Sequence, residues 1–96
     1  MIKHIVCFKL KDSSLEEKEK VRALLLSMQG RVPSAKKIEV GIDFLGSERS
    51  YDVILMVDLE NREALDTYQN DPYHVNTVKT YMHQARSGSV AVDYEF

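Results

Sequence analysis

Tyr68 and His74 are the two residues whose types and spacing suit proton transfer, and they lie six positions apart around Asp71-Pro72. On one unbroken α-helix, six residues turn the side-chain direction through about 600°, so the two rings would point to different sides. The proline disfavours helical angles at Asp71, so one helix ends there and another begins, with Asp71 as its cap and Pro72 at its first position. The break therefore allows the tyrosine and the histidine to converge over one pocket.

A histidine in the first turn of a helix favours the neutral imidazole, because the positive end of the helix dipole disfavours a second positive charge. His74 is therefore a candidate general base, and the Tyr68 hydroxyl is a candidate donor to a carbonyl or enolate oxygen. His4, in the first predicted strand, is expected as a third polar group in the same pocket. The walls that bind a small apolar ligand are expected to consist of Val6, Phe8, Leu24 and Met28.

Each polar residue also has a purely structural interpretation. Tyr68 can be a core tyrosine with a satisfied hydroxyl, and His74 can be a helix-start histidine bonded to backbone. His4 is then a strand histidine at an edge or interface, and Cys7 is a small buried hydrophobe. On this interpretation the chain is a non-catalytic dimeric module, which predicts no cavity of roughly 300 Å³ or more.

Composition and charge narrow the range of partners. The formal net charge is -2 and no basic run stands out, which argues against nucleic acid as a partner. No apolar run approaches the ~20 residues of a membrane helix, and the single cysteine suits a reducing cytoplasm. The 3 histidines lack the i, i+4 spacing of a zinc helix, and no glycine-rich phosphate loop occurs, so neither a metal nor a cofactor is predicted.

The first half of the chain predicts a strand, a helix and a hairpin. Residues 2–10 alternate as a strand that is apolar on both faces. Ser14 with Glu17, or the pair one residue earlier, fits a capping box that opens the first helix. The apolar stripe of that helix consists of Val21, Leu24, Leu25, Met28 and Val32. Residues 35–45 and 51–59 then form a hairpin.

Within that hairpin, Phe44 is expected on the same strand face as Ile38, Val40 and Ile42. The second half of the chain predicts two helices and a final strand. Asn61 caps a helix that runs to about Asn70. The apolar stripe of the following helix consists of Val75, Val78, Met82 and Ala85. Gly88 is expected to end the connection, and residues 89–96 form the last strand.

This order is βαββαβ, which predicts a ferredoxin-like α+β fold with a four-stranded antiparallel sheet and helices on one face. The 96 residues make a single domain, 1–96. Apolar residues on the uncovered face of the sheet need a partner, and these are Ile5, Cys7, Ile54 and Met56. The simplest partner for this face is a second copy of the chain related by a two-fold axis, so we expect a homodimer through the sheet face.

The chain resembles the stress-responsive A/B barrel domain family of the dimeric α+β barrel superfamily. The residues that carry the resemblance are Ile2-Lys3-His4-Ile5-Val6, Phe8-Lys9-Leu10, the stretch from Tyr68 to Val75, and Val92-Asp93-Tyr94. The resemblance implies a dimeric α/β barrel with a pocket between helices and sheet. A plant polyketide cyclase of this family uses a histidine and a tyrosine, and Tyr68, His74 and His4 occupy the matching positions.

Other members of the family are stress-induced proteins without established catalysis, so the resemblance implies fold more strongly than function. The preferred interpretation is a small stress-responsive A/B barrel protein whose physiological role is open. The first alternative is a small-molecule-binding or proton-transfer enzyme that uses His74 and Tyr68. A haem or quinone monooxygenase, which shares the superfamily fold, is the further alternative.

Overall fold

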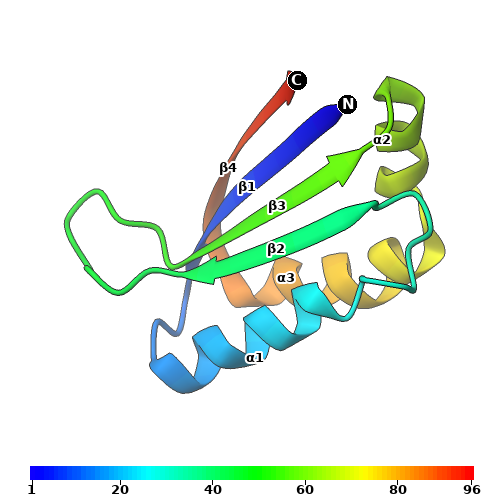
Figure 1. Ribbon diagram of the computed structural model, residues 1–96. Coiled ribbons are helices and arrows are strands. Elements are labelled where there is room, and N and C mark those ends of the chain that lie inside the picture. Colours follow the sequence, from blue (N-terminus) through cyan, green and yellow to red (C-terminus); the bar gives the residue numbers. More distant parts are fainter.

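The computed structural model describes residues 1–96 as a four-stranded sheet with all its helices on one face (Figure 1). The strands are β1 (Ile2–Leu10), β2 (Lys37–Ile42), β3 (Val53–Leu59) and β4 (Arg86–Glu95). The helices are α1 (Leu15–Leu26), α2 (Arg62–Gln69), the π-helix η1 (His74–Lys79) and α3 (Thr80–Ala85). The strand order is β2-β3-β1-β4 and every neighbouring pair is antiparallel, so the predicted ferredoxin-like α+β fold is confirmed.

The caps of the first two helices are the ones that the sequence predicts. The Glu17 N–H donates to Ser14 Oγ at 3.2 Å, which begins α1. The Glu17 carboxylate does not close the expected box; it accepts the Tyr81 hydroxyl at 2.8 Å instead. The Ala64 N–H donates to Asn61 Oδ1 at 2.8 Å, which begins α2. Each cap satisfies one backbone donor that the first helical turn leaves free.

The hairpin strands are shorter than predicted, because the ladder between β2 and β3 ends at the pair Ile42 and Val53. Beyond this pair, residues 43–52 leave the sheet as a projecting loop (Figure 1). The prediction that Phe44 shares a strand face with Ile38 is wrong: Phe44 lies beyond the end of β2 and its side chain is 96% exposed. One more backbone hydrogen bond, from the Asp43 N–H to the Asp52 carbonyl at 2.9 Å, follows this pair. The alternation of apolar residues in the sequence therefore continues beyond the end of the strand.

β4 is longer than predicted, since it begins at Arg86 and Gly88 lies inside it, opposite Lys9. The register between β1 and β4 shifts between Lys9 and Leu10. Such an irregularity accommodates an extra residue without ending the ladder. As a result β4 follows β1 along its whole length and forms one side of the cavity between sheet and helices.

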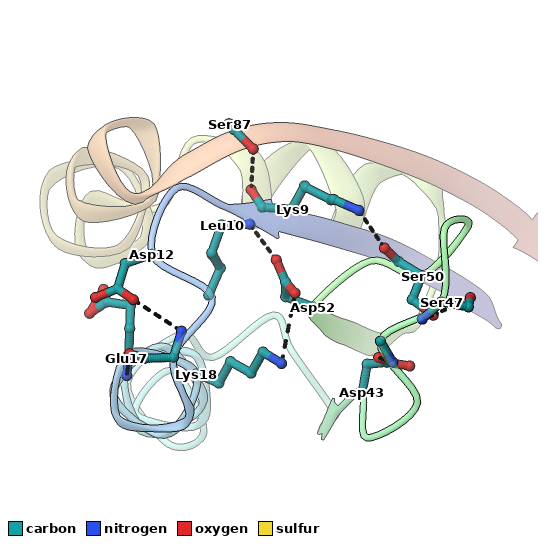
Figure 2. A network of polar contacts seen from close by, with 12 residues as sticks. Lys9, Leu10, Asp12, Glu17, Lys18, Asp43, Ser47, Ser50, Asp52 and Ser87 are labelled. Carbon is teal, nitrogen blue, oxygen red and sulfur yellow. Dashed lines mark hydrogen bonds and ion pairs between the residues drawn. The ribbon is translucent and has the colours of Figure 1, made fainter.

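A polar network anchors the base of the projecting loop (Figure 2). The buried carboxylate of Asp52 accepts the Leu10 N–H at 2.7 Å and lies 3.8 Å from Lys18 Nζ. Lys9 Nζ donates to the Ser50 carbonyl at 2.7 Å. A buried carboxylate is tolerated only when its oxygens are satisfied, and here the partners come from β1 and α1. The network therefore fixes the end of β1 relative to the first helix.

One core of 16 buried apolar residues lies between sheet and helices, and Tyr68 is the largest of its fully buried side chains. The opposite face of the sheet carries an apolar strip that we call the open-face stripe: Ile5, Cys7, Ile54, Met56, Val90 and Val92. Ile5 pairs with Met56 on one side and with Val92 on the other. Val90 is 48% and Val92 is 60% exposed, so this stripe has no cover within one chain.

Candidate functional site

Three aromatic rings from different elements meet above β1. The rings of Tyr68 and His74 stack with centroids 4.4 Å apart, and the His4 ring meets the Tyr68 ring edge-on at 5.5 Å. The break between α2 and η1 makes this possible, because Asp71 Oδ1 accepts the His74 N–H at 3.3 Å and begins the second helical segment. The convergence that the proline break predicts is therefore present in the structure.

The helix that carries His74 is wound as a π-helix over its first part, which the sequence did not predict. In a π-helix the backbone hydrogen bonds join residues five apart, so each turn contains more residues than a turn of α-helix. His74, Val78 and Met82, at a constant spacing of four, are all buried. Val75, which was expected inward, is 37% exposed. The buried stripe of this helical segment therefore begins at the imidazole and not at Val75.

A cavity of about 420 Å³ lies beside these rings, between the sheet and the helices. Val6 and Phe8 line it, as predicted. Leu24 and Met28 do not line it, and Leu25 forms the α1 side instead. The full apolar wall consists of Val6, Phe8, Leu25, Leu55, Val78 and Ala91. The apolar periodicity of α1 identified its buried face correctly but not which leucine on that face borders the cavity.

The Tyr68 hydroxyl is directed into the core in this structure. Its only partner is Met28 Sδ at 3.8 Å, and Met28 does not border the cavity. Burial raises the pKa of Tyr68, so the hydroxyl keeps its proton. The sequence-based hypothesis was that this hydroxyl donates a hydrogen bond to a ligand oxygen. In the structure it is the ring of Tyr68 that contributes to the site, stacked on His74 and edge-on to His4.

His4 is held by an acidic residue that the sequence analysis did not assign. Its Nδ1 bonds the Asp93 carboxylate, and the two residues are directly paired across β1 and β4. A carboxylate on Nδ1 fixes the ring and leaves Nε2 as the nitrogen free for another partner. No local pattern identifies this pair, because the register between the first and last strands is a long-range property.

His74 carries a perturbed imidazole. Burial lowers the pKa of His74, the positive charge of Lys79 lowers it further, and backbone acceptors at Tyr68 and Gln69 partly oppose the shift. Its Nδ1 is buried and has no hydrogen-bond partner. The expected direction towards a neutral ring is confirmed, but its first cause is burial rather than the helix end. A neutral imidazole with an unused nitrogen retains the capacity to accept a proton.

The lowered pKa of His74 predicts a specific pH dependence of stability. Above the ordinary pKa of 6.5, the titration of His74 takes nothing from the free energy of unfolding, because the ring is neutral in both folded and unfolded states. As pH falls through and below that value, the unfolded chain binds the proton first, so the free energy of unfolding decreases until the folded-state pKa is passed.

Urea unfolding at about pH 8 and about pH 5 should therefore show a smaller loss of stability for His74→Gln than for the parent, since glutamine does not titrate. The other two histidines remain in both proteins and cancel in the comparison. Equal losses in the two proteins would contradict the assignment.

The remaining candidates lie away from the rings. His83 is exposed and borders the cavity, and Cys7 is half-buried on the open-face stripe. No group of three or more histidine, cysteine, aspartate or glutamate side chains is arranged to hold a metal ion. No helix has the length and apolar character needed to cross a membrane.

The sequence analysis also missed two cations that border the cavity, Lys79 and Arg86. No local spacing identifies them, because Lys79 is the last residue of η1 whereas Arg86 is the first residue of β4.

Comparison with known proteins gives a consistent family match. The model of the family described as "Stress responsive A/B Barrel Domain" matches residues 2–96. No curated protein matches the chain in sequence. The family match therefore covers nearly the whole chain and the whole cavity described above.

Similar solved structures share the fold over almost the entire chain. A dimeric ferredoxin-like protein of unknown function from Bacteroides fragilis is 29% identical, with a TM-score of 0.82, covering 99% of this chain and 95% of that one. A dimeric ferredoxin-like protein from Thermobifida fusca is 24% identical, with a TM-score of 0.83 and coverage of 99% and 90%. A hydroxynitrile lyase from Passiflora edulis is 15% identical, with a TM-score of 0.79 and coverage of 97% and 90%, a likeness that extends to the fold alone.

Proposed function

Because the chain belongs to the stress-responsive A/B barrel domain family, we propose that it binds a small, largely apolar carbonyl compound and transfers a proton at the carbon beside the carbonyl. The observation that carries this proposal is the cavity of about 420 Å³, in which two imidazoles flank the Tyr68 ring. Two other hollows of the chain are larger, so the support for ligand binding comes from the three rings that converge on this cavity and not from its volume.

In the proposed step, neutral His74 accepts the proton as the carbon–hydrogen bond breaks. The electron pair of that bond forms the enolate, whose negative charge resides on the former carbonyl oxygen. His4 is turned towards this oxygen through Nε2, and the Asp93 carboxylate on Nδ1 fixes the orientation of the ring. His74 then returns its proton to carbon. The low polarity of the walls strengthens both interactions because water is excluded.

Tyr68 has a positioning role in this arrangement. Its ring lies between the two histidines and fixes the distance between them, while its hydroxyl stays bonded to Met28. No observation favours the haem or quinone monooxygenase alternative over proton transfer.

Deuterium exchange tests the proposal directly. A panel of aryl ketones is incubated with the protein in D2O, and loss of the proton signal beside the ketone is followed by NMR. The panel includes 5-oxo-5-phenylpentanoate and 5-oxo-5-phenylpentanamide, which share one exchangeable methylene beside the ketone. We expect at least one member to exchange faster with the protein than in buffer alone. An excess of a competing ligand should slow this exchange. Buffer-level exchange for the whole panel would overturn the proposal.

We also propose that the open-face stripe is covered by a second copy of the chain. Solved neighbours of this fold are described as dimeric, and the stripe leaves Val92 60% exposed in one chain. Exposed apolar strips of this kind are typical of interaction surfaces.

The substitution Val92→Asp should convert a particle of twice 11.0 kDa into one of 11.0 kDa, as measured by light scattering after gel filtration. A charge buried in an apolar interface has no partner there, so association is lost. The matched control is Val75→Asp, because Val75 is exposed on η1 in the helical layer. A parent protein that runs as a monomer, or a Val92→Asp dimer, would count against this interface.

A further inference from the structure

The mouth of the cavity is lined by cations and by no carboxylate. Lys79 from η1 and Arg86 at the start of β4 both border it, and His83 lies on the same rim. The lining includes neither aspartate nor glutamate. The whole chain has a formal net charge of -2, so the positive mouth runs against the overall charge of the protein.

The two cations are also uncommitted within the chain. Neither Lys79 nor Arg86 takes part in any of the ion pairs. Lys79 Nζ makes one long contact, a donation to the Gln69 carbonyl at 3.4 Å. By contrast Arg62, the cation in the neighbouring groove between α2 and β4, is paired with Glu95 at 2.7 Å.

That neighbouring groove provides an internal comparison. It has a volume of about 660 Å³ and is bordered by Asp66, Asp93 and Glu95, so its polar lining is mainly acidic. The two hollows therefore differ in charge although they adjoin the same strand. The positive lining is a property of the cavity beside the three rings and not of the whole helical face.

We propose that the ligand of this cavity is a carboxylic acid, with its carboxylate held at the mouth by Lys79 and Arg86 and its apolar body against Phe8 and Leu25. The guanidinium of Arg86 offers a planar fork that matches a carboxylate, and Lys79 adds a second charged donor. This inference rests on the proposed function for the carbonyl group that faces His74, but the anion site is defined by its own residues.

The carboxylate would also act on the base. Lys79 is among the groups that lower the pKa of His74. An anion bound beside Lys79 offsets that positive charge, so acid binding makes the imidazole a better proton acceptor. Through Lys79, the carboxylate of the ligand thereby influences the base that removes the proton from the ligand's carbon.

Calorimetric titration with 5-oxo-5-phenylpentanoate and its amide tests the anion site, because the two probes differ mainly in charge. We expect the acid to bind at least about 10-fold more tightly than the amide, as a charged hydrogen-bond pair implies. The double variant Lys79→Gln/Arg86→Gln should lose this preference. The control Lys20→Gln/Arg22→Gln removes the same two charges from the exposed face of α1 and should retain it.

Equal affinity for acid and amide, no binding of either, or an acid preference that survives in the Lys79→Gln/Arg86→Gln variant would overturn the anion site. The exchange assay separates this result from the proposed proton transfer. Acid preference without exchange leaves the anion site standing and removes the proton-transfer function. Exchange with equal affinities for acid and amide does the reverse.

Discussion

His74→Ala is expected to reduce deuterium exchange of a reactive aryl ketone by at least about 100-fold, the smallest effect usual for loss of a general base. The reason is that His74 lines the cavity and that burial favours the neutral form of its imidazole. Alanine removes the proton acceptor and enlarges the cavity. The rate is measured by NMR at saturating ligand, so a change in affinity does not imitate a change in catalysis.

Two controls separate chemistry from structure in this experiment. Added imidazole should restore part of the exchange in His74→Ala, because a free base can enter the space that the side chain vacates. Asn76→Ala changes an exposed residue of the same π-helix and should keep the parental rate. Unchanged exchange in His74→Ala would rule out this residue as the base.

Tyr68→Ala is expected to lower the free energy of unfolding by about 3–5 kcal/mol, the range for removing a large buried aromatic side chain. Tyr68 is 0% exposed and its ring contacts both His4 and His74. Domains of this size have a total stability of about 5–15 kcal/mol, so the variant should lose a large part of it. Urea unfolding followed by circular dichroism measures the difference.

Tyr68→Phe is the informative companion, because it removes only the hydroxyl. That group has one weak sulfur acceptor, so stability should change by less than about 1 kcal/mol. Exchange activity should also persist, since the positioning role belongs to the ring. Loss of exchange in a well-folded Tyr68→Phe protein would show that the hydroxyl acts on the ligand, contrary to the arrangement described above.

The two predictions together distinguish a base from a scaffold. His74 should affect rate far more than stability at neutral pH, and Tyr68 should do the opposite. A protein in which all three rings served only packing would show no exchange in the parent and comparable stability losses in both alanine variants. The ligand-binding proposal therefore does not depend on any single substitution.

The amino-acid sequence by itself determined the features that act over a few residues. Ser14 and Asn61 begin α1 and α2 because their side chains accept nearby backbone donors. Asp71-Pro72 ends α2 and begins the next helical segment, which allows Tyr68 and His74 to turn towards one another. The element order then leads to the ferredoxin-like sheet, because few topologies join these elements with right-handed crossovers.

Only the tertiary structure decided how these residues meet their partners. The His4–Asp93 pair depends on the register of strands at opposite ends of the chain. The π-helical winding of residues 74–79 has no short sequence signature here. The direction of the Tyr68 hydroxyl is likewise set by where Met28 packs. Caps and prolines act through neighbouring backbone groups, whereas register, winding and side-chain direction are set by segments that meet only after folding.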